Sequence, residues 1–261
     1  MPAAAGNVPA IEYLNIGKNF GAVRALDGIS LRIRQGEFVA IVGPSGCGKS
    51  TLLSLAAGIE TATDGDVRYM GDYVDGPNHR IGFVTQKDLL LPWRTVEENI
   101  RFPLEVRGQG ANAAARVAEV IEQVGLSGFG KKYISQLSGG MRKRVSIART
   151  LVYKPDVYLM DEPFGSLDAQ LRTTMHTDVL RLWRDTGSTM VFVTHDLGEA
   201  VVLAERVVVM TGRPGTIKAE VAIDMDKSTY RDAVSIQTAP EFQRYFAQLW
   251  SLIKSEQEMA L

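Results

Sequence analysis

The sequence contains a single cysteine, Cys47, among its 261 residues. An internal disulfide is therefore impossible, and the composition does not point to an oxidising compartment. No apolar run approaches the roughly 20 residues that a membrane-spanning helix requires. The opening stretch, MPAAAGNVPA, lacks the basic region and the apolar core of a signal peptide. We therefore expect a soluble, cytosolic chain that reaches a membrane only through a partner.

A strong excess of charge of either sign is also missing. The 29 Lys and Arg residues almost balance the 30 Asp and Glu residues, and the formal net charge is -1. Proteins dedicated to DNA or RNA usually carry a clear basic excess, so no nucleic-acid partner is expected. One local basic patch, Arg142-Lys143-Arg144, is compatible with this balance. The length suits one α/β domain or two small ones.

The spacing of apolar residues divides the chain into a core and an insertion. From Lys87 onward, Ala, Glu, Val and Ile recur at helical spacing, whereas the flanking segments contain short apolar runs typical of strands. A helical subdomain is therefore predicted within an α/β core. The predicted parts are a disordered lead-in (1–10), the core (11–86 and 151–240), the helical subdomain (87–150) and a C-terminal helix (241–261).

Two kinds of strand are predicted within the core. Residues 11–33 alternate apolar and polar side chains, which indicates a small antiparallel sheet with turns at Gly21 and at Asp27-Gly28. The stretches DVYLMDEP and TMVFVTHD contain continuous apolar runs, the pattern of strands buried on both faces of a parallel sheet. In the C-terminal helix, aromatic and aliphatic residues share one face. We expect that face to pack on its own domain, and a partner helix is the alternative.

A phosphate-binding loop follows the predicted strand at residues 38–42. Its sequence, GPSGCGKS, matches the pattern G-x-x-x-x-G-K-[ST] between a strand and a helix. Its glycines let backbone N–H groups turn toward phosphate, Lys49 adds a positive charge, and the Ser50 hydroxyl can bind Mg²⁺. The expected nucleotide contacts are Gly43, Pro44, Ser45, Gly46, Cys47, Gly48, Lys49, Ser50 and Thr51.

Cys47 lies inside this loop, and two interpretations of its side chain are open. We expect the thiol to point away from the nucleotide, so that only the backbone of Cys47 matters. The alternative is a reactive thiol whose pKa is lowered by the start of the following helix.

Polar residues end three of the predicted strands. Asp161 and Glu162 follow an apolar strand, where Asp161 suits the Mg²⁺ shell and Glu162 can polarise a water for attack on the γ-phosphate. His195 ends a neighbouring strand, at the edge where α/β sheets place ligands. Gln86 ends another and can reach the metal or the water. The alternative is that these residues only close their strands, but the phosphate loop favours the catalytic interpretation.

A second candidate phosphate site lies in QLSGGMRKRVSIART, residues 136–150. Ser138, Gly139 and Gly140 directly precede a predicted helix, and the N-terminus of a helix favours anions. One chain of this size thus has two candidate phosphate sites but only one lysine-bearing loop.

The combination resembles the ATP-binding cassette (ABC) family over residues 11–215. The motifs that carry the likeness are the phosphate loop, Gln86, LSGGM, the DE pair, GSLD and His195. The resemblance implies an α/β P-loop NTPase fold with a RecA-like core, a small antiparallel β-subdomain and an inserted helical subdomain. It also implies Mg²⁺ and ATP as cofactors, with Ser50, Gln86 and Asp161 as metal ligands.

In this family, two cassettes face each other head to tail, which would explain the second phosphate site. By this resemblance, Ser138, Gly139 and Gly140 bind the γ-phosphate of the ATP held by Lys49 of a second copy. Phe20 is similar to the aromatic residue that stacks on adenine, and Asp168 to the acidic residue that crosses the dimer interface. The likeness makes Glu162, His195 and Gln86 the catalytic residues. Met141, in place of the commoner Gln, and the GSLD tetrapeptide depart from the usual motifs without removing a catalytic group.

The sequence looks most like the importer branch that serves nitrate, taurine and aliphatic sulfonates. Pro92-Trp93, directly after the glutamine loop, and the RPG turn carry this likeness. It implies a bacterial importer subunit on the cytoplasmic face of the inner membrane, bound to integral membrane permease subunits and indirectly served by a solute-binding protein. Residues 89–93 are expected to help receive a permease helix, and simple packing is the alternative.

Three other functions remain open. The importer solute can differ, for example a pyrimidine precursor or an aromatic acid. A non-transport ABC ATPase is a second alternative, although the long coiled-coil insertion of repair proteins and the paired cassettes of translation factors are missing from the sequence. A P-loop kinase is the third, but it would not need the LSGG motif.

Overall fold

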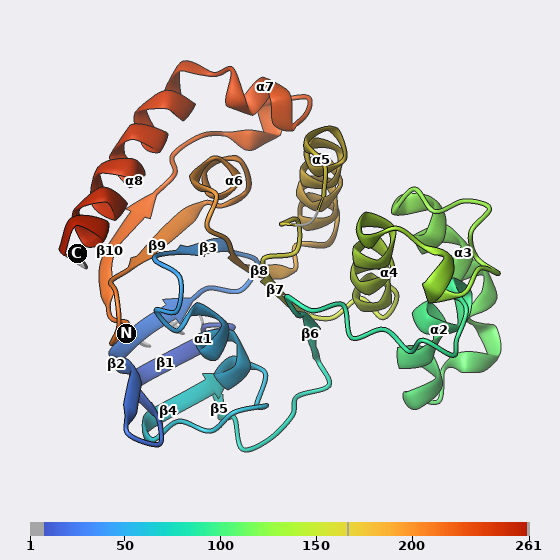
Figure 1. Ribbon diagram of the computed structural model, residues 1–261, viewed down its shortest axis with the longest axis horizontal. Coiled ribbons are helices and arrows are strands. Elements are labelled where there is room, and N and C mark those ends of the chain that lie inside the picture. The colour runs from blue at the N-terminus through green and yellow to red at the C-terminus, as the bar shows by residue number, and fades with distance from the viewer. Residues whose placement is uncertain (1–7, 166, 260–261) are drawn as a thin grey trace, which may run out of the picture.

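Two β-sheets and a group of helices make up the computed structural model, which describes residues 8–165 and 167–259 (Figure 1). The four-stranded sheet has the order β2-β1-β4-β5, and the six-stranded sheet has the order β10-β9-β3-β8-β7-β6. The figure places helices α2, α3 and α4 at one end of the molecule and the four-stranded sheet toward the other. The strands are β1 (Ile11–Phe20), β2 (Val23–Ile33), β3 (Phe38–Val42), β4 (Asp64–Tyr69), β5 (Asp72–Tyr73), β6 (Ile81–Val84), β7 (Val157–Asp161), β8 (Thr189–Val193), β9 (Arg206–Met210) and β10 (Ile217–Ala222).

The four-stranded sheet is antiparallel, as the alternating pattern predicted. Its first turn lies at Gly21, but the second predicted turn, at Asp27-Gly28, is wrong because both residues lie inside β2. The pairing passes from Ile16–Ile29 to Lys18–Leu26, so β2 uses one more residue than β1 over this interval. Gly28 has φ +61°, a conformation that glycine adopts without strain. The glycine at position 28 therefore marks a β-bulge and not a turn.

The six-stranded sheet is parallel except for β10, which pairs antiparallel with β9. Every residue of β3, β7 and β8 is buried, which confirms the interpretation of the continuous apolar runs. Val39 and Ile41 face a core shared with α1 (Lys49–Ala56) and the antiparallel sheet. Phe38, Ala40 and Val42 face the opposite core, which includes α5 (Ala169–Thr186) and α6 (Leu197–Leu203). The carboxyl ends of these strands carry the candidate site.

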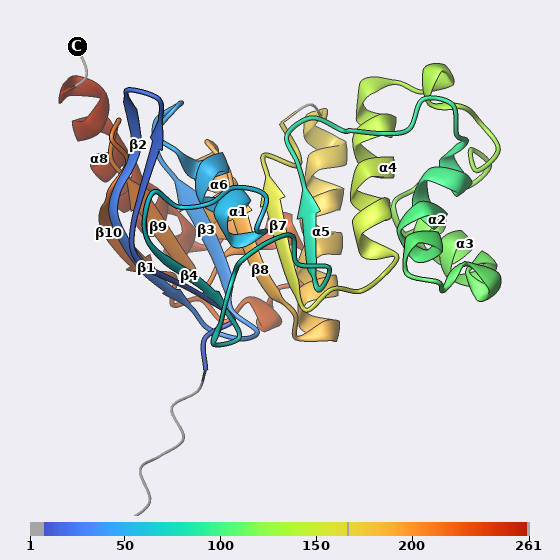
Figure 2. The same cartoon turned by 90° about the horizontal axis from the view of Figure 1, so that it is seen from below.

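Helices α2 (Val96–Val106), α3 (Ala114–Gln123) and α4 (Gly139–Leu151) form the projecting end of the molecule in both views (Figures 1 and 2). Short 3-10 turns, η1 (Gly110–Asn112) and η2 (Ile134–Gln136), connect them. Thr95 and Glu98 form a reciprocal capping box at the start of α2, which satisfies two backbone donors there. The buried side chains of α2, α3 and α4 belong to the same hydrophobic core as those of α5 and α6.

The C-terminal part consists of η3 (Lys227–Thr229), α7 (Ala233–Gln237) and α8 (Pro240–Met259). Phe242, Tyr245 and Leu249 are buried, so the aromatic stripe packs on its own domain as expected. Of the predicted lead-in, residues 1–7 lie outside the described chain. Ala10 is buried and its N–H donates to the carbonyl of Ile33, so residue 10 already belongs to the antiparallel sheet and not to the lead-in.

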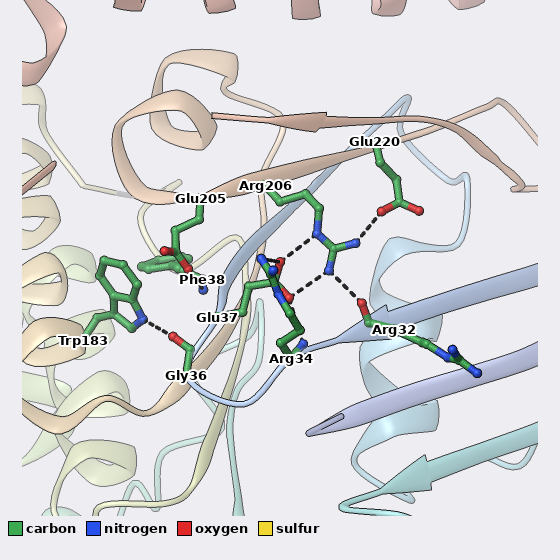
Figure 3. Close-up of polar contacts among 9 residues, drawn as sticks. All are labelled: Arg32, Arg34, Gly36, Glu37, Phe38, Trp183, Glu205, Arg206 and Glu220. Atoms are coloured by element: carbon green, nitrogen blue, oxygen red, sulfur yellow. Dashed lines mark hydrogen bonds and ion pairs between the residues drawn. The ribbon is translucent and has the colours of Figure 1, made fainter. Parts of the chain in front are cut away.

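A buried ion pair joins the two sheets near the start of β3 (Figure 3). The guanidinium of Arg206 on β9 donates two hydrogen bonds to the carboxylate of Glu37, at 2.8 and 2.9 Å. It also donates to the carbonyl of Arg32 on β2 at 2.7 Å and contacts Glu220 on β10. Burial alone would raise the pKa of Glu37, but its bonds to Arg206 and Arg34 outweigh burial and lower it.

Glu37→Gln is expected to destabilise the fold by about 2 kcal/mol, because it removes the buried carboxylate that accepts two charged hydrogen bonds from Arg206 and leaves Arg206 with the more exposed Glu220. Since the pKa of Glu37 is lowered in the folded protein, the wild-type contribution is present near neutral pH and is lost as the pH falls through the folded pKa. Urea unfolding at pH 7 and at acid pH measures both effects. Arg34→Ala is the matched control, since its side chain is 72% exposed and its pair with Glu37 should contribute under about 1 kcal/mol. Equal stability of Glu37→Gln and wild type at pH 7 would contradict the assignment.

Candidate nucleotide-binding and catalytic site

The predicted phosphate loop runs from the end of β3 to the start of α1. Gly48 precedes the helix with φ +99°, and a Cβ there would lie 2.5 Å from the Leu26 side chain, so only glycine fits. Lys49 is only 6% exposed. Its Nζ donates to the carbonyls of Gly43 and Pro44, both at 2.8 Å. The ammonium is therefore held across the loop, where phosphate oxygens would meet it.

Cys47 is buried and does not present a reactive thiol to the nucleotide. Burial raises the pKa of the thiol, and the nearby Lys49 charge and backbone N–H groups only partly oppose this. The alternative of an activated thiol is therefore wrong, because the side chain is 1% exposed and its burial raises the pKa of the thiol.

Asp161 ends β7 beside the start of α1. Its carboxylate accepts a hydrogen bond from the Ser50 side chain. Asp161 is only 6% exposed, and this burial raises the pKa of its carboxyl group, so a nearby cation would stabilise the ionised form. Ser50, Asp161 and Gln86 supply only oxygen donors to a metal, the chemistry that Mg²⁺ prefers. Mg²⁺ usually takes one or two carboxylates together with substrate phosphates, so this set fits it.

No group of three or more His, Cys, Asp or Glu side chains in the described parts of the chain is placed to hold a metal.

Glu162 lies between the other two predicted catalytic residues. Gln86 Nε2 donates to Glu162 Oε2 at 3.2 Å, and His195 Nδ1 lies 3.5 Å from Glu162 Oε1. Glu162 has φ +46°, a left-handed conformation that a non-glycine residue rarely adopts and that costs about 1–3 kcal/mol. Its N–H donates to the carbonyl of Val193 on β8, which holds the strained backbone in place. This geometry aims the carboxylate of Glu162 away from the strand and toward the groove.

A groove of about 480 Å³ is lined by the phosphate loop, Gln86 and Glu162, whereas Asp161 and His195 are not among its described lining residues. Phe20, at the end of β1, lies on its wall with 46% of its surface exposed, and Lys18 Nζ lies 4.8 Å from the ring centre. An exposed ring beside the phosphate loop suits stacking on a base. The described lining residues are Phe20, Val23, Ala25, Ser45, Gly46, Gly48, Lys49, Ser50, Thr51, Gln86, Glu162 and Arg213.

Sequence reasoning did not identify Arg213 as a site residue. Its guanidinium donates to the Gly46 carbonyl at 3.2 and 3.3 Å, so the turn after β9 supports the phosphate loop from outside. The RPG tripeptide predicts a turn and marks the importer branch, but the contact of Arg213 with a loop 167 positions away has no local signal.

Lys143 is a second residue that sequence reasoning misread. The basic patch that the composition left open at Arg142-Lys143-Arg144 does not include Lys143, which is only 2% exposed. Its Nζ donates to the carbonyls of Thr85 and Gln86, both at 2.9 Å. Burial lowers the pKa of Lys143, although the charges of Asp88 and Asp161 oppose this. Lys143 thus links α4 to the backbone of Gln86, a predicted catalytic residue.

The second predicted phosphate site is not part of this groove. Ser138 and Gly139 are exposed at the start of α4, where the Ser138 hydroxyl accepts from the Met141 N–H at 3.3 Å. Asp168 is exposed at the start of α5, and its carboxylate accepts from the Leu171 N–H at 2.9 Å. The described residues that line the groove do not include Ser138, Gly139, Gly140 or Asp168. The two candidate phosphate sites, the phosphate loop and the start of α4, therefore lie at separate places on the chain.

Comparison with known proteins gives the family. The model of the family described as "ABC transporter" matches residues 26–165. The chain is 42% identical to the taurine import ATP-binding protein TauB of Jannaschia sp., over 92% of this chain and 90% of that protein. It is also 42% identical to the nitrate import ATP-binding protein NrtD of Synechocystis sp., over 93% of this chain and 92% of that protein.

A solved structure supports the same conclusion for the fold. The dimeric, post-hydrolysis structure of the ATP-binding cassette MJ0796, bound to ADP and Pi, aligns with a TM-score of 0.76 and 31% identity. The alignment covers 82% of this chain and 99% of that one. The phosphate loop, the strand-end carboxylates and the separate LSGG segment occur on a matching fold. The chain therefore belongs to the ABC transporter family and is an ATP-binding cassette.

Proposed function

We propose that this chain is the ATP-hydrolysing subunit of an importer for a small anion or organic anion. The observation that carries the proposal is the position of Glu162, held between Gln86 and His195 in the same groove as Lys49. A carboxylate so placed can accept a proton from a water that attacks the γ-phosphate in line. Lys49 and Mg²⁺ held by Ser50, Gln86 and Asp161 would offset the charge that develops on the phosphate.

The division of phosphate-binding groups supports a head-to-tail dimer. The exposed start of α4 presents backbone N–H groups and a hydroxyl without a phosphate loop beside them. A second copy would bring Ser138, Gly139 and Gly140 over the ATP on Lys49, with Asp168 crossing the interface. Contacts through the γ-phosphate exist only before hydrolysis, so ATP would favour the closed dimer and its loss the open one.

Integral membrane permease subunits are the proposed partners, and a solute-binding protein would act on them from the other side. In the described residues, no helix has the length and apolar character needed to span a bilayer. We place the chain peripherally on the cytoplasmic face of the membrane, bound to the permease. The names of the relatives favour taurine, nitrate or a similar anion as the solute.

A groove of about 400 Å³ between the helical part and the core is the proposed docking place. Leu89 lines this groove and is 63% exposed, and Trp93, two residues after the lining residue Leu91, is 71% exposed, although large apolar side chains usually avoid water. An amphipathic permease helix would cover these side chains. The apolar residues that line the groove are Ile81, Phe83, Leu89, Leu91, Phe102, Pro103, Val106 and Tyr153.

Trp93→Ala should weaken binding to the permease roughly 30-fold, the effect of removing a central aromatic side chain from an interface. Transport and permease-stimulated ATPase activity should fall, whereas ATP affinity of the isolated chain should not change. The matched control is Trp250→Ala, since Trp250 is 54% exposed on α8. If Trp93→Ala and Trp250→Ala were equally harmless to transport, the docking place would be wrong.

The function as a whole is tested by capture from native membranes. A tagged Glu162→Gln chain, purified with Mg-ATP, should co-purify with a multi-span membrane protein. The expected stoichiometry is two permease subunits to two cassettes. Recovery of soluble protein or nucleic acid alone would overturn the transport role and favour a non-transport ABC ATPase. The genes of the recovered permease and its binding protein would then identify the solute, including a pyrimidine precursor or an aromatic acid.

A further inference from the structure

Glu199 lies at the centre of a buried polar cluster behind the catalytic edge. It belongs to α6, is 6% exposed, and accepts a hydrogen bond of 2.6 Å from the Thr194 hydroxyl at the end of β8. Its other carboxylate oxygen lies 3.2 Å from His176 Nε2 on α5. Arg172 Nε, also on α5, lies 3.8 Å from the same oxygen, as an ion pair too long for a hydrogen bond. Three elements thus meet at one carboxylate.

The carboxylate of Glu199 stays ionised although it is buried. Burial would raise its pKa, but the hydrogen bonds from His176 and Thr194 and the charge of Arg172 outweigh burial and lower it. A buried charge of this kind is costly unless its partners remain in place, so the cluster strongly disfavours rearrangement. The ring of Phe164, two residues after Glu162, packs edge-on against His176 with ring centres 5.2 Å apart.

The cluster reaches the loop of His195, a predicted catalytic residue, and the loop of Asp168, a predicted interface residue. Thr194 directly precedes His195, and the Thr194 hydroxyl also accepts from the Asp196 N–H at 3.0 Å. Arg172 Nη2 donates to the carbonyl of Leu167, the residue before Asp168, at 3.1 Å. Arg172 Nη1 lies 3.7 Å from the Asp196 carboxylate. The loop of His195 and the loop of Asp168 are therefore connected through the buried Thr194 and Glu199 and the half-buried Arg172.

We propose that Glu199 is a positioning residue for ATP hydrolysis, which fixes His195 through Thr194 and fixes the Asp168 loop through Arg172. This inference rests on the proposed ATPase function and extends it to residues outside the nucleotide groove. His195 is itself 66% exposed in its side chain, and its only described polar neighbour among the catalytic groups is Glu162 at 3.5 Å. Its orientation must then come from the backbone at residues 194–196, which the Thr194 hydroxyl holds on both sides.

The cluster also gives a reason for a buried histidine, His176, at a position where an apolar side chain would pack equally well. His176 Nδ1 is buried and has no hydrogen-bond partner among the described residues. A purely structural side chain at this position would more often be apolar, since a buried unsatisfied nitrogen costs about 1–3 kcal/mol. The hydrogen bond between Nε2 and Glu199 is the contact that a histidine provides here in return for this cost.

Thr194→Val tests the proposal, because it keeps the shape of the side chain and removes only the hydroxyl. The kcat for ATP hydrolysis should fall roughly 10- to 100-fold, the effect of a misplaced catalytic group, while KM and the ATP affinity stay within about twofold. Thr194→Ser, which retains the hydroxyl, should recover most of the lost kcat. Thr174→Val is the matched control, since the Thr174 hydroxyl only donates to the Gln170 carbonyl on the exposed side of α5.

Glu199→Gln provides a second variant, because it keeps the size of the side chain and removes the charge that holds Arg172 and His176. It should also lower kcat without raising KM, and thermal unfolding identifies any variant that fails to fold. Unchanged kcat in folded Thr194→Val and Glu199→Gln, with an active wild type, would overturn the positioning role. So would parallel changes in kcat and ATP affinity. A wild-type chain without ATPase activity would instead refute the proposed function on which the inference rests.

Discussion

Glu162→Gln should lower the kcat for ATP hydrolysis about a thousandfold while leaving ATP affinity nearly unchanged. The amide is isosteric with the carboxylate, so it can keep the contacts to Gln86 and His195, which lie within 3.2 and 3.5 Å of the native carboxylate oxygens. An amide cannot accept the proton of an attacking water at neutral pH. The variant should therefore bind ATP and hold it unhydrolysed. Single-turnover hydrolysis and equilibrium binding of a fluorescent ATP analogue measure the two effects separately.

The control for this prediction is Glu241→Gln. Glu241 is an exposed residue in the first turn of α8, so the same chemical change there should leave turnover unaltered. Near-normal turnover of Glu162→Gln would show that another group activates the water. A loss of ATP affinity as large as the loss of kcat would show that Glu162 acts mainly in binding.

Lys49→Ala should weaken ATP binding roughly a hundredfold, since a charged hydrogen bond to phosphate contributes about 1.5–3 kcal/mol. The Lys49 ammonium already lies inside the loop, held by the carbonyls of Gly43 and Pro44. Its loss removes the charge that meets phosphate and leaves these two carbonyls without their donor. Affinity for ATP and for ADP, measured by isothermal titration, should fall together.

Lys131→Ala is the matched control, because Lys131 is exposed in the helical part of the chain. It removes the same charge from the protein as a whole, so it separates the local effect from the change in net charge. ATP affinity of Lys49→Ala within twofold of the Lys131→Ala value would contradict the assigned role of the phosphate loop.

The parts of the fold that follow a local pattern could be predicted from the sequence. β3, β7 and β8 are continuous apolar runs because both of their faces are buried, and that cause is visible in the residues themselves. The position of Asp161 and Glu162 at the end of β7 follows from the same apolar run, and their roles in the site stay predictions. Glu162 lies next to a strand whose position in the sheet determines where its carboxylate points.

The remaining features depend on contacts between distant segments. Lys143 looked like a surface cation because its neighbours in sequence are basic, yet it is buried against the carbonyls of Thr85 and Gln86. Gly28 looked like a turn because a β-bulge and a turn both favour glycine. Glu199 gave no signal, since its partners His176 and Arg172 lie on another helix.

The most direct test of the central claim, that ATP is held between two copies of this chain, is the mass of Glu162→Gln in solution. Multi-angle light scattering would compare the protein without nucleotide, with Mg-ADP and with Mg-ATP. The account predicts the mass of one chain in the first two cases and of two chains with Mg-ATP, because only the γ-phosphate joins Lys49 of one copy to Ser138 of the other. The mass of one chain in all three conditions, with ATP shown to be bound, would contradict it.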